Sequence, residues 1–216
     1  MKGLLIKDIL NLKNYMKQLI LVFIFFVAYG IFLKNGTFVG SMTTMMLSMQ
    51  VITTMSYDEY AKWDKYALTM NINRKDVVLS KYVFFIICIV AGIIIGDIVS
   101  LAINSFADVP LSIKEILMIS ITIPCIFAIL FSIVIPIVFK VGVEKARVVM
   151  MAVFFIPAIL VFAVVKMAQK ANIPMPDEAT LDMMFKFGLV GVIILTILIV
   201  FASYKISLSI YNKKEF

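Results

Sequence analysis

The chain has 216 residues, of which 63% are hydrophobic and 15% are charged, and its formal net charge is +7. Soluble domains are roughly 45–50% apolar and about 25% charged, so this composition excludes an ordinary soluble domain. The chain has no histidine and no Gly-x-x-x-x-Gly-Lys-Ser/Thr motif, which excludes histidine-dependent catalytic triads, histidine zinc sites and a P-loop nucleotide site on this polypeptide.

The apolar residues fall into six long runs, and a helix needs about 20 residues to span the hydrocarbon core of a bilayer. We therefore predict an all-α, polytopic membrane protein that forms a single transmembrane domain over residues 1–216. The six predicted spans are residues 18–33, 37–56, 81–104, 113–139, 148–165 and 187–204. Lys34, Asn35 and Gly36 favour a tight turn, so the first two spans should form a hairpin.

Lysine and arginine are unevenly distributed between the two sides of this arrangement. With the N-terminus in the cytoplasm, fifteen of the 20 basic residues fall in cytoplasmic segments. Such an excess predicts a multi-pass protein of the cell membrane with both termini in the cytoplasm. The basic residues can meet anionic lipid, so the positive charge does not require a nucleic-acid partner.

Residues 3–17, before the first span, have an amphipathic pattern. Apolar residues recur at helical spacing on one face, namely Leu5, Ile9, Leu12, Met16 and Leu19. Polar residues fall on the opposite face, namely Lys7, Asn11, Asn14 and Gln18. The pattern predicts an interfacial helix that lies in the headgroup plane before the chain turns into the membrane. The alternative is a cytoplasmic extension of the first span.

The segment between the second and third spans is predicted to form a short amphipathic helix over residues 57–70. Ser56 and Glu59 match a capping box, which predicts that the helix begins there. Its aromatic and apolar face is formed by Tyr60, Trp63, Ala67 and Met70. Asn73 suits the cap of a further helix that leads directly into the third span. The alternative is a membrane-surface helix with Trp63 at the interface.

Residues 166–186 form the longest predicted external segment. Pro174 and Pro176 should end a helix that arrives from the fifth span, and Asp177 and Glu178 suit the first turn of another. We predict a small external cap over the bundle.

The segment that follows the second span carries an acidic pair, a tryptophan, an arginine and a Lys-Tyr pair that opens the third span. The residues in question are Asp58, Glu59, Trp63, Tyr66, Arg74, Val77, Val78, Lys81 and Tyr82. On this pattern the chain resembles the ABC-2 type permeases, the membrane subunits of certain ATP-driven exporters. It is similar to the short, six-span group that includes the phenol-soluble-modulin exporter permeases, with Asn71 where that group usually has proline.

The resemblance implies a permease that dimerises, with itself or a second permease, and that recruits a separate ATPase subunit. ATP and Mg²⁺ would bind to that partner, and this chain would hold no cofactor. The cytoplasmic helix would dock on the ATPase as a coupling helix. The implied docking residues are Asp58, Glu59, Tyr60, Lys62, Trp63, Tyr66, Met70 and Arg74. Lys81 and Tyr82 would couple its movement to the third span, and the cargo would be an amphipathic peptide or a lipid-like molecule.

The third predicted span contains one carboxylate and three small residues at four-residue spacing. A charge in hydrocarbon costs at least about 2.5–3.5 kcal/mol, so Asp97 should face protein or water. It lies about 24 Å beyond Lys81 along a helix, near the outer headgroups. A pathway carboxylate and a polar contact at the interface are both consistent with this position. Gly92, Gly96 and Ser100 would allow close helix contact, at a dimer interface or within the chain.

Two classes of function are consistent with these patterns. The first is the permease subunit of an ABC exporter, and the alternative is an ATP-independent channel or transporter. An intramembrane enzyme is disfavoured because the chain lacks histidine and paired buried carboxylates for acid–base chemistry. Methionines of the second span suit contact with varied apolar ligands, although ordinary packing explains them almost as well. They are Met42, Met45, Met46, Met49 and Met55.

Overall fold

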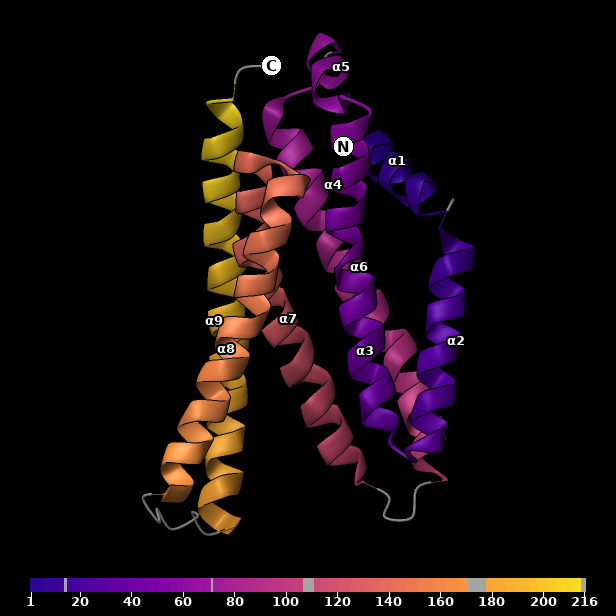
Figure 1. The fold of residues 1–216 in the computed structure, drawn as a ribbon, viewed down its shortest axis with the longest axis vertical. Coiled ribbons are helices and arrows are strands. Elements are labelled where there is room, and N and C mark those ends of the chain that lie inside the picture. Colours follow the sequence, from indigo (N-terminus) through magenta and orange to yellow (C-terminus); the bar gives the residue numbers. More distant parts are fainter. Residues whose placement is uncertain (14, 71, 107–110, 171–177, 215–216) are drawn as a thin grey trace.

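The computed structural model describes residues 1–13, 15–70, 72–106, 111–170 and 178–214, with the backbone alone described at positions 68, 168–169 and 178–187. These residues form helices, and no strand occurs among them (Figure 1). The helices in chain order are α1 (Lys2–Lys13), α2 (Met16–Phe32), α3 (Gly36–Ser48), α4 (Gln50–Tyr60), α5 (Trp63–Thr69), α6 (Arg74–Asn104), α7 (Ile113–Val141), α8 (Val143–Lys170) and α9 (Glu178–Asn212).

Four helices of the described chain are individually long and apolar enough to cross a membrane. They are α6, α7, α8 over Val143–Met167 and α9 over Gly188–Asn212. Helices α1 and α2 pass the same test only as a pair that is bent by 65°. A bend at this point is what an interfacial helix before the first span requires. The protein is thus a multi-pass membrane protein, and the count of six spans stays a prediction.

Helices α3 and α4 occupy the second predicted span. Only Met49 separates them, and its backbone angles (φ −65°, ψ −18°) stay in the helical region. Hydroxyl groups along α3 donate to carbonyl oxygens one turn back, for example Thr43 Oγ1 to Val39 O at 2.7 Å and Ser48 Oγ to Thr44 O at 2.7 Å. These polar side chains are thereby satisfied without water.

The prediction of a helix that begins at Ser56 is wrong. Helix α4 continues through Ser56 to Tyr60. The chain then turns at Lys62, which has a left-handed backbone conformation (φ 49°), and α5 begins at Trp63. A capping box needs the Glu59 carboxylate at the Ser56 amide, but this carboxylate accepts a hydrogen bond from Val143 N instead. The predicted helix 57–70 is therefore the end of α4 followed by the seven residues of α5.

The other predicted boundaries can be compared directly with the structure. Asn73 precedes α6 in an extended conformation, as expected of a cap, although its side chain makes no capping hydrogen bond. Helix α8 continues to Lys170 and α9 begins at Glu178, so helices occupy both ends of the predicted external cap. The rest of that segment, residues 171–177, lies outside the described residues.

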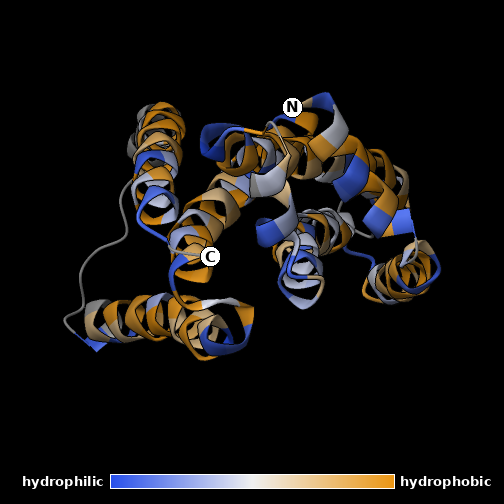
Figure 2. Cartoon of the chain, turned by 90° about the horizontal axis from the view of Figure 1, so that it is seen from above, coloured by the Kyte–Doolittle hydropathy of each residue, from blue (hydrophilic) through white to orange (hydrophobic). Residues whose placement is uncertain are grey.

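The buried core lies toward the end of the bundle that carries α5. Aromatic side chains from three helices meet there, and the ring centroids of Phe85 on α6 and Phe131 on α7 are 6.0 Å apart. Tyr211 near the end of α9 is fully buried and lies 5.6 Å from the ring of Phe139. By contrast, the apolar window of α8 has no buried residue. Hydrophobic residues predominate along most of the helices (Figure 2), as expected of helices that lie in lipid.

Helices α3 and α6 approach each other through their backbones. A Cβ atom added at Gly96 would lie 2.9 Å from the Cα of Gly40, and one added at Gly92 would lie 2.8 Å from the Cα of Thr44. A Cβ at Gly36 would lie 2.3 Å from the carbonyl oxygen of Ser100. The small residues of α6 therefore pack within the chain, which is one of the two arrangements that their spacing allows.

Replacing Gly96 with valine should force α3 and α6 apart. We expect Gly96→Val to destabilise the protein by about 1–3 kcal/mol, the usual cost of overpacking a tight contact. Thermal unfolding of the purified protein in detergent measures the change. Gly191→Val is the matched control, because an added Cβ there has no neighbour within 4 Å. Equal destabilisation by the two variants would contradict the proposed packing.

Candidate functional site

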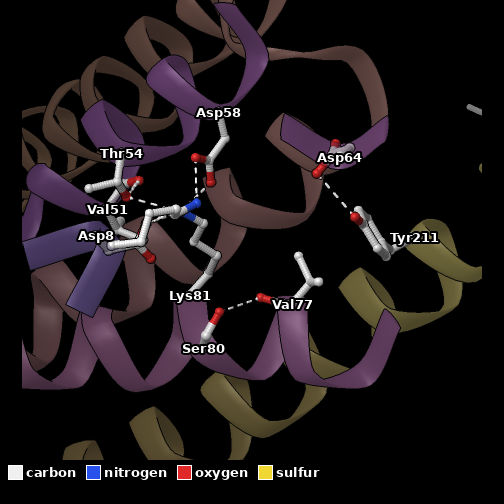
Figure 3. Close-up of polar contacts among 10 residues, drawn as sticks. Asp8, Val51, Thr54, Asp58, Asp64, Val77, Ser80, Lys81 and Tyr211 are labelled. Carbon is white, nitrogen blue, oxygen red and sulfur yellow. Dashed lines mark hydrogen bonds and ion pairs between the residues drawn. The ribbon is translucent and has the colours of Figure 1, made fainter. Parts of the chain in front are cut away.

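Four charged side chains from three helices meet near α5, and Figure 3 labels three of them, Asp8, Asp58 and Lys81. The ammonium of Lys81 on α6 lies 2.8 Å from Asp8 Oδ1 of α1 and 2.7 Å from Asp58 Oδ2 of α4. Lys7 Nζ lies 2.5 Å from Asp58 Oδ1 and 3.4 Å from Asp8 Oδ1. We call Lys7, Asp8, Asp58 and Lys81 the ion cluster. It contains two positive and two negative groups, so its formal charges balance.

The ion cluster is shielded from solvent. The side chains of Lys81 and Asp8 are 4% and 1% exposed. Asp58 and Lys7 are 12% and 21% exposed. The second carboxylate oxygen of Asp8 has no hydrogen-bond partner in the described chain. Removing one partner of such a group leaves an uncompensated buried charge, so the cluster holds α1, α4 and α6 together.

Helix α5 is attached to α1 and α9 through adjacent residues. The ammonium of Lys7 lies 4.6 Å from the ring centroid of Trp63, a cation–π contact. On the other side, the Tyr211 hydroxyl donates to Asp64 Oδ1 at 3.0 Å (Figure 3). Lys214 Nζ lies 4.0 Å from Asp64 Oδ2. Burial raises the pKa of Asp64, while the hydrogen bond from Tyr211 and the charge of Lys214 oppose this rise.

Arg74 joins the start of α6 to the end of α9. Its Nη1 donates to the carbonyl oxygens of Tyr211, Asn212 and Lys214 at 3.1, 2.5 and 3.2 Å. Carbonyl oxygens at a helix C-terminus lack partners within the helix and carry partial negative charge, so a guanidinium is a favourable partner. Asp64 on α5 and Arg74 at the start of α6 therefore both contact the C-terminal end of α9.

The end of α4 contacts the beginning of α8. Glu59 Oε2 accepts a hydrogen bond from Val143 N at 2.6 Å, at the positive end of the α8 dipole. The Tyr60 hydroxyl donates to Glu144 Oε1 at 2.8 Å. This hydrogen bond to the Glu144 carboxylate raises the pKa of Tyr60. Glu59 and Tyr60 thus bind α8 as well as being exposed on the surface.

The remaining residues of the predicted docking set differ in exposure. Tyr66 is 61% exposed and Met70 is 50% exposed, and Lys62 is also exposed. Trp63 is half-buried, and its indole nitrogen is buried without a described hydrogen-bond partner. Asp58 is buried in the ion cluster and so does not contribute to an exposed face. The docking role of the whole set stays a prediction.

Tyr82 connects α6 to the helices of the C-terminal half. Its hydroxyl forms hydrogen bonds with Ser203 Oγ at 2.5 Å and Ser207 Oγ at 2.8 Å on α9. Ser203 Oγ in turn donates to the carbonyl oxygen of Ser132 on α7. The two residues expected to couple movement to the third span, Lys81 and Tyr82, thus contact opposite sides of the bundle.

A recess of about 220 Å³ lies between the ion cluster and the ends of α7 and α9. Its charged lining residues are Asp58, Glu59, Asp64, Lys81, Lys140 and Lys214. The lining thus contains three acidic and three basic side chains. Among the described residues no group of three His, Cys, Asp or Glu side chains is placed to hold a metal ion.

The sequence patterns did not identify several residues of this region as part of a site, namely Lys7, Asp8, Asp64, Glu144 and Tyr211. Asp8 carried a usable signal, because it stands beside the apolar stripe of the predicted interfacial helix. A carboxylate in that position needs a cation from another element. The partners of Asp64 and Glu144 are far away in the sequence, and no local pattern identifies them.

Removing the Lys81 ammonium should leave Asp8 and Asp58 with too little positive charge. We expect Lys81→Met to destabilise the protein by about 3–5 kcal/mol, measured as the shift in thermal unfolding. Lys75→Met on the same helix is the control, because Lys75 is exposed. If Lys81→Met unfolds no earlier than Lys75→Met, the ion cluster does not hold the helices together.

Removing the Tyr211 hydroxyl should loosen α5 without creating a large cavity. Trp63 is the only tryptophan and reports on α5 by its fluorescence. We expect Tyr211→Phe to increase acrylamide quenching of Trp63 by about 1.5- to 3-fold, because losing one hydrogen bond of about 1 kcal/mol raises the population of detached α5. Tyr204→Phe, on the same helix but in contact with Tyr82, is the control. Unchanged quenching in Tyr211→Phe would show that the hydroxyl does not hold α5.

Comparison with known proteins agrees with this architecture. A family model described as "ABC-2 family transporter protein" matches residues 3–212, nearly the whole chain. No match was found among the curated proteins or among the solved structures. The matched region extends from α1, which carries Lys7 and Asp8 of the ion cluster, to the end of α9. The chain therefore belongs to the ABC-2 transporter family and is the membrane permease component, not the ATPase, of an ABC transporter.

Proposed function

We propose that this chain is the permease of an ABC exporter and that α5 is the helix on which a separate ATPase subunit docks. The observation that carries the proposal is the combination of exposure and attachment at α5. Its outer side presents Tyr66, and Met70 follows directly, while its inner side is fixed to other helices through Trp63 and Asp64. Exposed aromatic side chains on a fixed helix are typical anchors for a protein partner.

A force applied to α5 would reach three other helices. It would pass to α1 through the contact of Trp63 with Lys7, to α9 through Asp64, and to α6 through the short connection that ends at Arg74. In this proposal, ATP and Mg²⁺ bind to the ATPase, and closure of the ATPase subunits moves α5. The positive-inside distribution supports a cytoplasmic position for α5 and for both termini.

The cargo that the structure suits best is amphipathic, such as a cytotoxic or antimicrobial peptide or a lipid-like molecule. A recess of about 600 Å³ lies between α4, α7 and α8, on the α5 side of the bundle. Methionine and aromatic side chains dominate its lining, including Met45, Met49, Met150, Phe131 and Phe154. Such flexible, polarizable surfaces adapt to varied apolar ligands. Arg147 and Tyr57 also line it and supply polar groups.

A second permease copy, identical or related, completes the proposed transporter. Helix α8 supports this step, since the apolar window of its 28 residues has no buried residue in the isolated chain. By comparison, 28% of the apolar window of α6 and 39% of that of α7 are buried. A partner helix in the membrane would give α8 the packing that the single chain does not supply.

Shortening Tyr66 tests the docking role of α5. With the cognate ABC ATPase co-expressed, we expect Tyr66→Ala to reduce co-purification of the ATPase by about tenfold and to abolish ATP-dependent cargo transport, because exposed tyrosines often dominate binding energy. The thermal stability should remain that of the unchanged protein, because Tyr66 is largely exposed.

Tyr29→Ala is the matched control, because Tyr29 is an exposed tyrosine on α2, away from α5. Undiminished ATPase recruitment in Tyr66→Ala would contradict the docking assignment. Cargo flux through vesicles that contain this chain alone, without any ATPase, would instead favour an ATP-independent channel or transporter.

A further inference from the structure

Asp97 is a carboxylate in the half of α6 remote from α5 that has no cationic partner in the described chain. It accepts a hydrogen bond from Ser120 Oγ of α7 at 2.5 Å. The ion pairs among the described residues all involve other carboxylates. The two nearest turns of α6 contain no lysine or arginine. An ionised side chain in an apolar helix is costly unless a cation or water accompanies it.

The side of Asp97 that faces α3 has room for no more than a water molecule. A cavity of about 10 Å³ is lined there by Ser41, Thr44, Ser100 and Ser120. Ser100 is 2% exposed, and its hydroxyl has no hydrogen-bond partner among the described residues. A cavity of this size, with several polar groups around it, suits one bound water. It does not have the volume for an organic cation.

The other side of Asp97 opens onto an apolar groove. This groove, of about 420 Å³, lies between α6, α7 and α9. Its apolar walls include Ile89, Ile93, Leu117, Ile121 and Ile193. Ile89 lies about 12 Å from Asp97 along α6, so apolar wall extends from the carboxylate toward the middle of the bundle. The groove is within the size range of small-molecule sites.

We propose that this groove binds a single-chain cationic amphiphile, with its ammonium group at Asp97 and Ser120 and its hydrocarbon tail along the apolar walls. An ammonium carries three donors and a positive charge, which the carboxylate and the Ser120 hydroxyl can accept. A phosphate headgroup would meet only the negative charge of Asp97. The groove is separate from the methionine-lined recess, which lies on the α5 side and is formed by other faces of the bundle.

This proposal assigns a class of ligand to the groove. Only the role of that ligand in transport rests on the proposed permease function. Binding itself needs no ATPase. A failure to bind the amphiphile would leave ATPase recruitment through Tyr66 untouched, and loss of ATPase recruitment would leave this binding site in place.

Photolabelling of the full chain in phosphatidylcholine nanodiscs tests the site. The probes are an alkylamine and an alkanol with the same diazirine-bearing chain. Labelling of residues 113–128, on the groove wall, is divided by labelling of α2, whose exposed side chains Leu21, Ile24 and Phe25 report bulk lipid. We expect this ratio to be about tenfold higher for the amine than for the alcohol, as a charge-assisted hydrogen bond would give.

Asp97→Asn keeps the size of the side chain and its ability to accept from Ser120, and it should reduce the amine ratio to that of the alcohol. Asp76→Asn at the other end of α6 is the matched control and should keep the excess. Ile121→Trp, which fills the groove at a partly exposed position, should reduce labelling by both probes. Equal labelling by amine and alcohol in the unchanged protein, or an amine excess that persists in Asp97→Asn, would overturn the proposal.

Discussion

The arrangement at the α5 end of the bundle depends on charge compensation in a place that solvent hardly reaches. Lys81 and Asp8 are almost completely buried, and each is tolerable only while the other remains within contact. Because the four members of the ion cluster come from α1, α4 and α6, these helices cannot separate one at a time without leaving a buried charge unpaired. Apolar packing alone would set no such condition, since lipid is as apolar as the helices themselves.

Next to the ion cluster, α5 and the start of α6 are held by contacts with α1 and with the end of α9. Trp63 meets α1, Asp64 meets Tyr211, and Arg74 binds the end of α9. The contacts distribute any load on α5 between the N-terminal and C-terminal helices. If α5 is the docking helix that we propose, its movement would act on both halves of the permease, whereas a helix attached to α6 alone would turn only α6.

The sequence was informative where a signal is local and uninformative where a contact joins distant segments. Long apolar runs predicted α6, α7, α8 and α9, because about 20 apolar residues have few alternatives to a spanning helix. The capping-box motif at Ser56 predicted a helix start that the structure does not have, because the Glu59 carboxylate accepts a hydrogen bond from Val143 N at the start of α8. The ion cluster was not foreseen as a unit, since Asp8, Asp58 and Lys81 come from three segments and no spacing relates them. Small residues on α6 indicated close packing, but only the structure identified α3 as the neighbour.

The backbone contact between α3 and α6 has a mechanical consequence. Where glycines let two main chains touch, no flexible side chains lie between them to absorb a sliding movement. These two helices should therefore travel as one body, while α7 and α9, which form the other extensive helix pair, travel as a second. In the proposed exporter, an alternation between inward and outward openings would then be a rocking of one pair against the other.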